Sequence, residues 1–422
     1  MRSRRKSPEP AAPAGTRGRD RPSPPPPGIL YGPGENLPGV VILDEIRSPT
    51  GILLWQAARD AVLWASVPPG RRGELFARGA LSGRLARLPA GTAEAAPEGG
   101  LRQLTWLLLQ DPGSAAPQEV AAACKEVAEW AERRGALGVA LAFYQAAALV
   151  DPEDPVSALR TGLAASRRGE GARAEAWLRR TIVLAHRRRH GAAYAHANLE
   201  LGNLYVSRGE PLHARRFFLY AVRHARRRGL RDIRAQALHG LFDLAHSGAI
   251  ADDPDPFGRE ALWFHSAAHP RVPELFRAWV RLRFRKDPPV PVLTAPTGAL
   301  HCRGPAPARA LLFAILAREA AGAGASEQYE WAWDRAWALL VQRAGRHGDT
   351  GHVPALLELA HAAAEAGEWS RAEYMGQRAL DAAISGRDEE REREVERFLT
   401  SLWSRSGRMD WLGRPHGPPP RR

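Results

Sequence analysis

The residues that could bind a metal ion are histidines and cysteines. Two of the histidines have the spacing of neighbours on one face of a helix. His186 and His190 lie four residues apart, which would place two imidazoles on one face of a helix, where they could bind a metal ion. The three residues between them are Arg187, Arg188 and Arg189, and no carboxylate is near. Because these cations would repel a metal ion, we predict no metal site here.

The other reactive side chains lack partners at a useful spacing. Cys124 and Cys302 are far apart, which excludes a disulfide framework and a four-cysteine metal site. His347 and His352 lie in a glycine-containing stretch that is typical of a linker, and His301 next to Cys302 belongs to no motif. The sequence also lacks a glycine-rich phosphate loop, a His-Glu-x-x-His helix and a nucleophile elbow. We therefore predict that the protein is not an enzyme and has no cofactor.

Arginine is the residue type whose placement is unusual. Residues 155–236 hold 18 arginines and 5 acidic residues, so this stretch carries most of the formal net charge of +14. Two clusters, at 186–190 and 223–231, each lie at the C-terminal end of an expected helix. Both clusters lie at the same distance along the chain from the turn glycine of their own repeat. Adjacent helix pairs would then place the clusters about 10 Å apart, as an edge that could bind nucleic acid or an acidic protein. The arginines of this basic edge are Arg187, Arg188, Arg189, Arg223, Arg226, Arg227 and Arg228.

A second interpretation of these clusters is ordinary helix-end chemistry. Cations near a helix C-terminus complement its dipole by about 0.3–1 kcal/mol each. Arginine is also the general cation of this chain, since lysine occurs only at positions 6, 125 and 286. Aromatic residues do not interleave with the arginines in the way that base stacking would need. Attraction to an acidic protein is therefore favoured over specific nucleic-acid binding, and all three interpretations stay open.

The elements that must position these residues are expected to be helices. Alanine, leucine, arginine and glutamate dominate, and β-branched residues are sparse, so we predict an all-α protein. A four-residue pattern of a glycine, a small residue, a wedge residue and a second small residue recurs along the chain. A period near 34 residues predicts stacked helix pairs. The pattern occurs at Gly135, Ala140, Tyr144, Ala147; at Gly169, Ala174, Leu178, Thr181; at Gly209, Ala214, Phe218, Ala221; and at Gly367, Ala372, Gly376, Ala379.

Each position of the pattern has a physical role. Glycine permits the positive φ of the turn between paired helices. The small residue lets the second helix approach the first closely, and the larger residue fills the wedge between neighbouring pairs. The step from Gly169 to Gly209 is 40 residues, not 34, which predicts that the second helices around it are longer than usual.

Residues 195–228 resemble a tetratricopeptide repeat (TPR), with Asn198 where the family pattern has tryptophan. Units starting near 121, 155 and 353 are less complete matches, and the array is degenerate near 250–345. The layout as a whole resembles uncharacterised bacterial TPR proteins. The matching positions in the best unit are Leu201, Gly202, Tyr205, Gly209, Ala214, Phe218 and Ala221.

This resemblance implies a right-handed superhelical solenoid of helix-turn-helix repeats that acts as a non-enzymatic protein–protein interaction scaffold. The first helix of each pair would line a concave groove that takes up a peptide or helix of a partner protein, with acidic partners included. The mixture of apolar and polar side chains suits such a ligand. The expected groove residues are Val156, Leu159, Leu163, Arg167, His196, Leu199, Asn203 and Val206.

The chain is expected to have four parts. They are a disordered Pro/Arg-rich tail at 1–38, an N-terminal helical cap at 39–117, the TPR-like repeat array at 118–405 and a disordered tail at 406–422. Prolines in 287–304 forbid a regular second helix there, so we expect an irregular loop that replaces a lost helix. The chain has no apolar leader and no run long enough to span a membrane, so we expect a cytoplasmic protein without a membrane partner.

Inside the cap, the residue pattern predicts four elements. Gly39–Ile42 is a short apolar run, expected to be extended. Thr50 is expected to cap a helix over 50–66, in which Gln56, Arg59 and Asp60 form a narrow polar face. Two further helices are expected over 72–88 and 101–109, the second ending before a turn.

Overall fold

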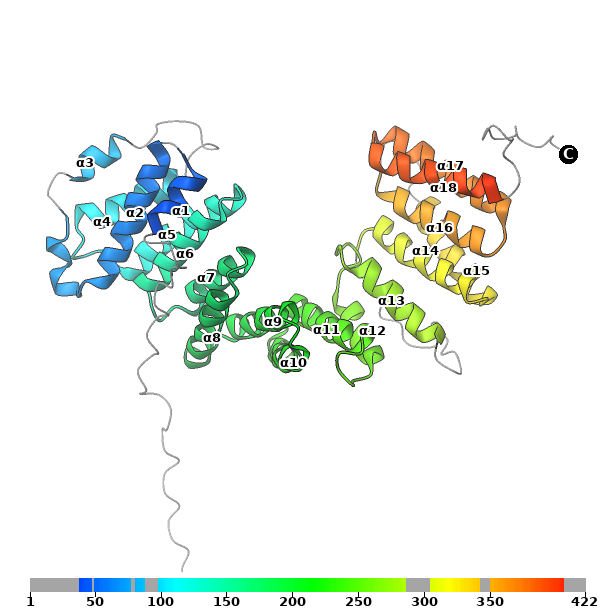
Figure 1. Ribbon diagram of the computed structural model, residues 1–422, viewed down its shortest axis with the longest axis horizontal. Coiled ribbons are helices and arrows are strands. Elements are labelled where there is room, and N and C mark those ends of the chain that lie inside the picture. The colour runs from blue at the N-terminus through cyan, green and yellow to red at the C-terminus, as the bar shows by residue number, and fades with distance from the viewer. Residues whose placement is uncertain are drawn as a thin grey trace, which may run out of the picture. The chain divides into compact units, whose positions relative to one another are not determined.

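The protein is described by a computed structural model that covers residues 38–47, 49–76, 80–87, 98–285, 304–341 and 350–405 (Figure 1). Over these residues the regular structure is helical and includes no strand. The chain divides into two compact units, Met1–Leu204 and Tyr205–Arg422. The prediction of an all-α protein is confirmed.

Among its described residues, the first unit has eight α-helices and the start of a ninth. They are α1 (Pro38–Glu45), α2 (Pro49–Ser66), α3 (Ala80–Leu85), α4 (Glu98–Gln110), α5 (Pro117–Arg133), α6 (Leu137–Val150), α7 (Pro155–Arg167) and α8 (Gly171–Arg187), followed by α9 (Gly191–Ser207), which continues past the unit boundary. A 3-10 segment, η1 (Pro69–Glu74), follows α2. From α4 to α8, each helix packs against the next one in the chain.

The described helices that follow α9 lie in the second unit. They are α10 (Pro211–Arg228), α11 (Arg231–His246), α12 (Pro254–Phe264), α13 (Val272–Arg285), α14 (Ala306–Gly322), α15 (Ser326–Val341), α16 (Val353–Glu365), α17 (Trp369–Ser385) and α18 (Glu389–Arg405), with a 3-10 segment η3 (Thr350–His352) before α16. In the second unit, the described helices from α10 to α15 each pack against the next one, α16 packs on α14, and α16, α17 and α18 again pack in order.

The turns between paired helices have the predicted backbone. Gly135, Gly169 and Gly209 have φ values of 75°, 77° and 72°, in the left-handed region. Other residues are strained there because their Cβ atom crowds the backbone. The glycine of the recurring pattern is therefore a requirement of each turn.

Close helix contacts also follow the pattern. Ala214 of α10 and the wedge residue Phe218 are both 0% exposed. Phe218 fills the space beside α11, where a Cβ added to Gly240 would lie only 2.6 Å from its ring. Small residues at these crossings let the helices pack at native density, and even one added methyl group would force the helices apart.

The 40-residue step comes from longer helices. The second helices α8 and α10 have 17 and 18 residues, whereas α6 has 14. The first helix α9 is also longer, with 17 residues against 13 in α7. The prediction of extended second helices is therefore confirmed. Within the step from Gly169 to Gly209, the longer first helix α9 contributes as well as the longer second helix α8.

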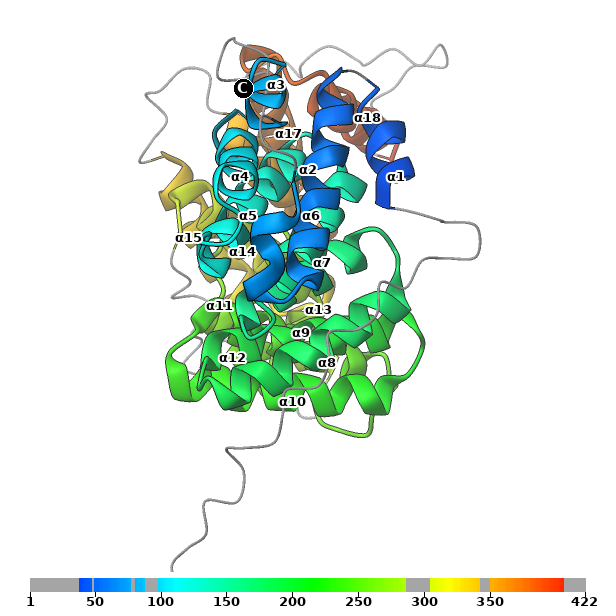
Figure 2. The ribbon, with the colours of Figure 1, turned by 90° about the vertical axis from the view of Figure 1, so that its left-hand side faces the viewer.

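The beginning of the cap differs from the prediction. Gly39–Ile42 lies within helix α1, not in an extended segment. Pro38 suits the first position of a helix, and Ile42 is fully buried. The reason is tertiary: α1 and α2 pack on each other and both pack on α6 (Figure 2).

Glu45 of α1 supplies the cap that α6 lacks locally. The residue before α6, Ala136, has no side chain that could accept a hydrogen bond from the first turn. The Glu45 carboxylate instead accepts hydrogen bonds from the backbone N–H of Gly138 at 2.7 Å and of Val139 at 2.9 Å. Two of the unpaired donors at the helix N-terminus are thereby satisfied from a segment 93 residues away.

Three further expectations for the cap need correction. The helix expected from Thr50 begins at Pro49, which occupies its first turn. Asp60, assigned to an exposed polar face, is buried and forms ion pairs with Arg59 and Arg84. The single helix expected over 72–88 is replaced by η1 and the short α3, since glycines at 70 and 73 weaken a helix there. The last expected helix forms as α4.

Several predicted regions lie outside the described residues. They are the two tails, at 1–38 and 406–422, and the proline-rich segment 287–304, apart from Pro38 in α1 and the exposed Gly304.

The contribution of the Glu45 carboxylate, which caps the N-terminus of α6, to protein stability can be measured. Glu45→Ala should lower the free energy of unfolding by about 1 kcal/mol, because two backbone N–H groups lose their acceptor. Urea unfolding followed by circular dichroism would measure this. Asp44→Ala, at an exposed position of the same helix, is the control and should change stability little. Equal effects of the two substitutions would contradict the capping role.

Candidate functional site

The expected groove residues are not all on the surface. Leu159 and Leu199 are only 7% and 1% exposed. Their side chains pack inside the helical core, so we leave these two out of the candidate site. The other six are half-buried or exposed, and they are Val156, Leu163, Arg167, His196, Asn203 and Val206. Because Val206 belongs to the second unit and the others to the first, their union in one groove stays a prediction.

The polar members of this set have partners within the protein. Arg167 forms an ion pair with Glu132, whose carboxylate also accepts a hydrogen bond from the Tyr144 hydroxyl at 3.0 Å. This contact links α5, α6 and α7. His196 lies 3.5 Å from Glu200 on the same helix. In the first unit, then, these charges partly serve to hold helices together.

The first arginine cluster lies at the end of α8. Arg188 is exposed and its guanidinium is 3.8 Å from Glu153. Arg189 has a φ of 53°, the left-handed conformation that ends the helix. Arg187, half-buried, is the last residue of α8. Helix termination accounts for part of this cluster.

His186 and His190 are not on one helix, because α8 ends between them. The Nδ1 atom of His190 instead accepts a hydrogen bond from the backbone N–H of Ala193, at the start of α9. Over the described ranges, no group of three or more histidine, cysteine, aspartate or glutamate side chains is arranged to hold a metal ion.

The second arginine cluster lies on α10 and differs in its pairing. Its four arginines are all exposed, and none forms an ion pair with another described residue. They are Arg223, Arg226, Arg227 and Arg228. Because α8 and α10 belong to different units, the expected distance of about 10 Å between the clusters stays a prediction.

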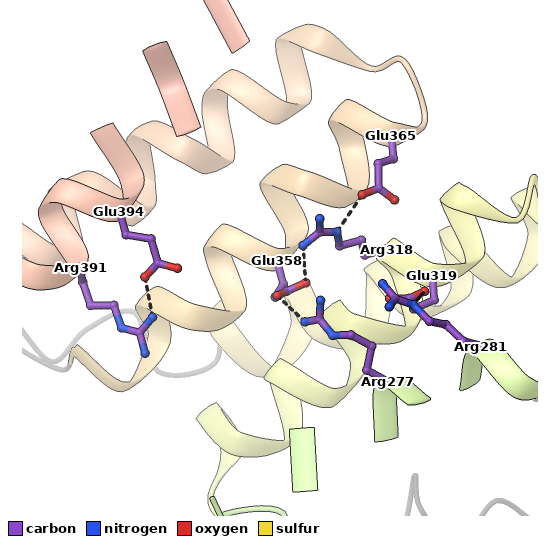
Figure 3. Close-up of polar contacts among 8 residues, drawn as sticks. All are labelled: Arg277, Arg281, Arg318, Glu319, Glu358, Glu365, Arg391 and Glu394. Atoms are coloured by element: carbon purple, nitrogen blue, oxygen red, sulfur yellow. Dashed lines mark hydrogen bonds and ion pairs between the residues drawn. The ribbon is translucent and has the colours of Figure 1, made fainter. Parts of the chain in front are cut away.

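A charged network that sequence reasoning missed lies on α13, α14 and α16 (Figure 3). Glu358 of α16 accepts hydrogen bonds from Arg277 at 2.6 Å and from Arg318 at 3.3 Å. Arg318 also donates to Glu365 at 2.8 Å. On the neighbouring turn, Arg281 donates to Glu319 at 2.6 Å. We call these six residues the inner-face network.

The inner-face network joins helices that are not consecutive in the chain. Arg277 belongs to α13 and Glu358 to α16, two helices that both pack on α14. Their side chains meet at hydrogen-bond distance, so α13, α14 and α16 present these charges on one shared face. Figure 3 shows Glu358 between the two arginines.

The arginines of this face retain unused donors. A guanidinium has five N–H donors, whereas the inner-face network engages one from Arg277, one from Arg281 and two from Arg318. Arg281 is also 51% exposed. The carboxylates hold the guanidiniums in place and leave donors free for a carbonyl or carboxylate group of a ligand.

His361 lies among these charges. Burial, followed by the nearby Arg318, lowers the pKa of His361 to about 4. Its ring packs edge-on against Phe398 of α18, with 4.5 Å between ring centroids. The imidazole is therefore neutral near pH 7, and it serves as a packing group between α16 and α18.

The inner-face network could not be found by the spacing arguments used for the repeats. Arg277 and Arg281, at i and i+4, share a helix face in the sequence, as do Glu358 and Glu365 at i and i+7. Their pairing, however, joins residues 81 positions apart in the degenerate part of the array. In the sequence alone, where the relative position of α13 and α16 is unknown, these residues resemble ordinary exposed charges.

Comparisons with known proteins do not identify a family. No protein-family model matches this chain, and no curated protein matches it.

Across the described residues, no helix combines the length and the apolar character needed to cross a bilayer.

The second unit also buries two neighbouring histidines whose burial outweighs the nearby acidic groups. His239 and His265 are about 5% exposed and their rings pack edge-on at 5.7 Å. Burial, then Arg271 beside His239 and His269 beside His265, lowers their pKa values to about 3 and about 4. Asp243 lies 3.6 Å from His239, but it also pairs with Arg271.

These histidines should make the second unit sensitive to acid. In the unfolded chain their pKa is about 6.5, so below that pH the unfolded state binds protons that the folded state refuses. Stability is therefore full above pH 6.5 and falls toward pH 4, by up to about 1.4 kcal/mol per pH unit for each histidine. Urea unfolding at pH 7.5 and 5 checks this. His239→Gln should reduce the pH dependence, whereas His213→Gln, at an exposed position, should leave it unchanged.

Proposed function

We propose that this protein is a non-enzymatic scaffold of TPR-like helix pairs. In this proposal, the concave face of α13, α14 and α16 binds a segment of a partner protein. The observation that supports it most is the contact of Arg277 and Glu358 across α14. It puts side chains of α13 and α16 on one shared face, and a concave face of this kind is a common geometry for binding an extended peptide or a helix.

The chemistry of this surface suits a polar peptide. Fixed guanidiniums with unused donors favour carbonyl and carboxylate groups, and adjacent carboxylates favour amide and cationic groups. Charges held in this way give a docked segment a defined register more than a large gain in affinity.

A second candidate function uses the arginines of α10 and of the end of α8 to bind nucleic acid or an acidic partner. It is favoured by the exposed arginines at 223 and 226–228, which lack ion pairs among the described residues. The length of α10 and its lack of acidic side chains are compatible with either kind of partner. A steep salt dependence would be expected of nucleic acid.

Affinity capture from the native lysate, with mass spectrometry, tests the inner face. Arg277→Gln/Arg281→Gln should reduce recovery of the specific partner about tenfold or more, because two guanidiniums that orient it are lost. Arg393→Gln/Arg397→Gln makes the same charge change at exposed positions of α18 and should retain the partner. The circular dichroism spectra of both variants should match that of the parent.

Two results would count against this function. If both double variants lost the same proteins, the capture would reflect charge and not the inner face. If nucleic acid were the recovered species and its capture fell steeply with salt, the second candidate function would replace the first.

A further inference from the structure

Helix α10 has one buried side and one strongly cationic outer side. Its buried residues are Ala214, Phe218, Ala221 and Ala225. The opposite side carries no acidic residue, since α10 contains none. Its outward residues are Leu212, Arg216, Leu219, Tyr220, Arg223, Arg226 and Arg227, and we call this surface the α10 outer face.

The residues of the α10 outer face form adjacent rows along the helix. Leu212 and Leu219 are seven residues apart and form an apolar row. Arg216 and Arg223, also seven apart, form a parallel row beside it, and Tyr220 with Arg227 forms a third. The arginine row borders the apolar row, and the seven-residue step of the leucines is the spacing that two helices use to pack along each other.

The charge of this surface is not neutralised by its surroundings. The inward-leaning Arg215 is held by Asp252 through two hydrogen bonds, at 2.6 and 2.8 Å. By contrast, Arg223, Arg226 and Arg227 form no ion pair with any described residue. The contrast separates arginines that stabilise the fold from arginines directed to solvent.

Helix-end chemistry explains only part of this surface. A cation stabilises the last turn of a helix through the dipole, and the effect fades beyond that turn. Arg226 and Arg227 lie in the last turn of α10. Arg223 lies before the last turn, and Arg216 lies in the N-terminal half, where the dipole does not favour a cation.

The apolar row argues for a protein over nucleic acid. Leu212 is 72% exposed, more than any other large apolar side chain among the described residues. A phosphate backbone would leave it in water, whereas the apolar side of a helix would cover it. Charge complementarity then requires acidic residues beside the apolar row of the partner, facing the arginines of α10.

We propose that the α10 outer face docks an acidic amphipathic helix of a partner protein. Leucines of that helix cover Leu212 and Leu219, and its flanking carboxylates pair with Arg216, Arg223 and Arg227. The proposal rests on the scaffold function and assigns one kind of occupant to the arginines of α10, on a different helix from the inner-face network.

The test uses the full chain and a fluorescent synthetic peptide with one leucine row flanked by glutamates. A peptide with lysines in place of the glutamates and a short duplex DNA are the comparison probes. Anisotropy titrations at low and physiological salt should show binding of the acidic peptide, with little binding of its lysine counterpart. Arg216→Gln/Arg223→Gln/Arg227→Gln should weaken acidic-peptide binding about tenfold, since three exposed pairs are lost.

Two further variants make the test specific. Arg259→Gln/Arg393→Gln/Arg397→Gln removes the same charge from other exposed positions of the second unit and should bind as the parent does. Leu212→Ser should weaken acidic-peptide binding several-fold and leave DNA binding unchanged. All variants are compared with the parent by circular dichroism.

Three outcomes would overturn the proposal. One is equal binding of the acidic peptide by the parent and the α10 triple variant. Another is equal loss in the control triple variant. The third is tighter binding of DNA, with no effect of Leu212→Ser on either probe. Arg277→Gln/Arg281→Gln should retain peptide binding to α10, so failure of this surface and failure of the inner face are separable.

Discussion

Close approach of neighbouring helices at small residues is the constraint on which the other features of this structure depend. At Gly162, Gly240 and Gly376, an added Cβ would lie within 2.9 Å of a side chain on the next or previous helix. In an interior packed at this density, an extra methyl group at these positions would have to displace the side chain packed against it. Each helix pair is therefore locked against its neighbour, and side chains on successive helices can meet at hydrogen-bond distance.

That locking explains why arginines in one protein have different roles. Where two helices pack on a shared neighbour, as α13 and α16 do on α14, Arg277 reaches a carboxylate of a helix far along the chain. Where a helix face points outward, as on α10, Arg223 finds no carboxylate among the described residues within ion-pair distance. A paired guanidinium orients a surface, and an unpaired one attracts an acidic partner from a distance. Similar composition thus produces two surfaces with different chemistry.

Local sequence was sufficient for the parts of the fold that depend on backbone chemistry and repeat spacing. The turns at Gly135 and Gly169 need a positive φ, and the sequence shows a glycine there. The 40-residue step predicted longer helices, and α8 and α10 have them. The helices of the N-terminal cap region were harder to predict, because no repeat spacing applies there. Gly39–Ile42 became helical since α1 packs on α6 and its Glu45 caps that helix.

For the candidate site as well, the sequence predicted some features and only the structure revealed the others. Arginine clusters can be counted in a sequence, but exposure cannot, and Leu159 and Leu199 proved to be buried while Leu212 is exposed. By itself the sequence determined the helical class, the glycine turns and the location of the excess positive charge, because these depend on residue type and short spacing. Only the tertiary structure decided which charges are paired, since Arg277 and Glu358 are 81 residues apart and meet through the packing of helices between them.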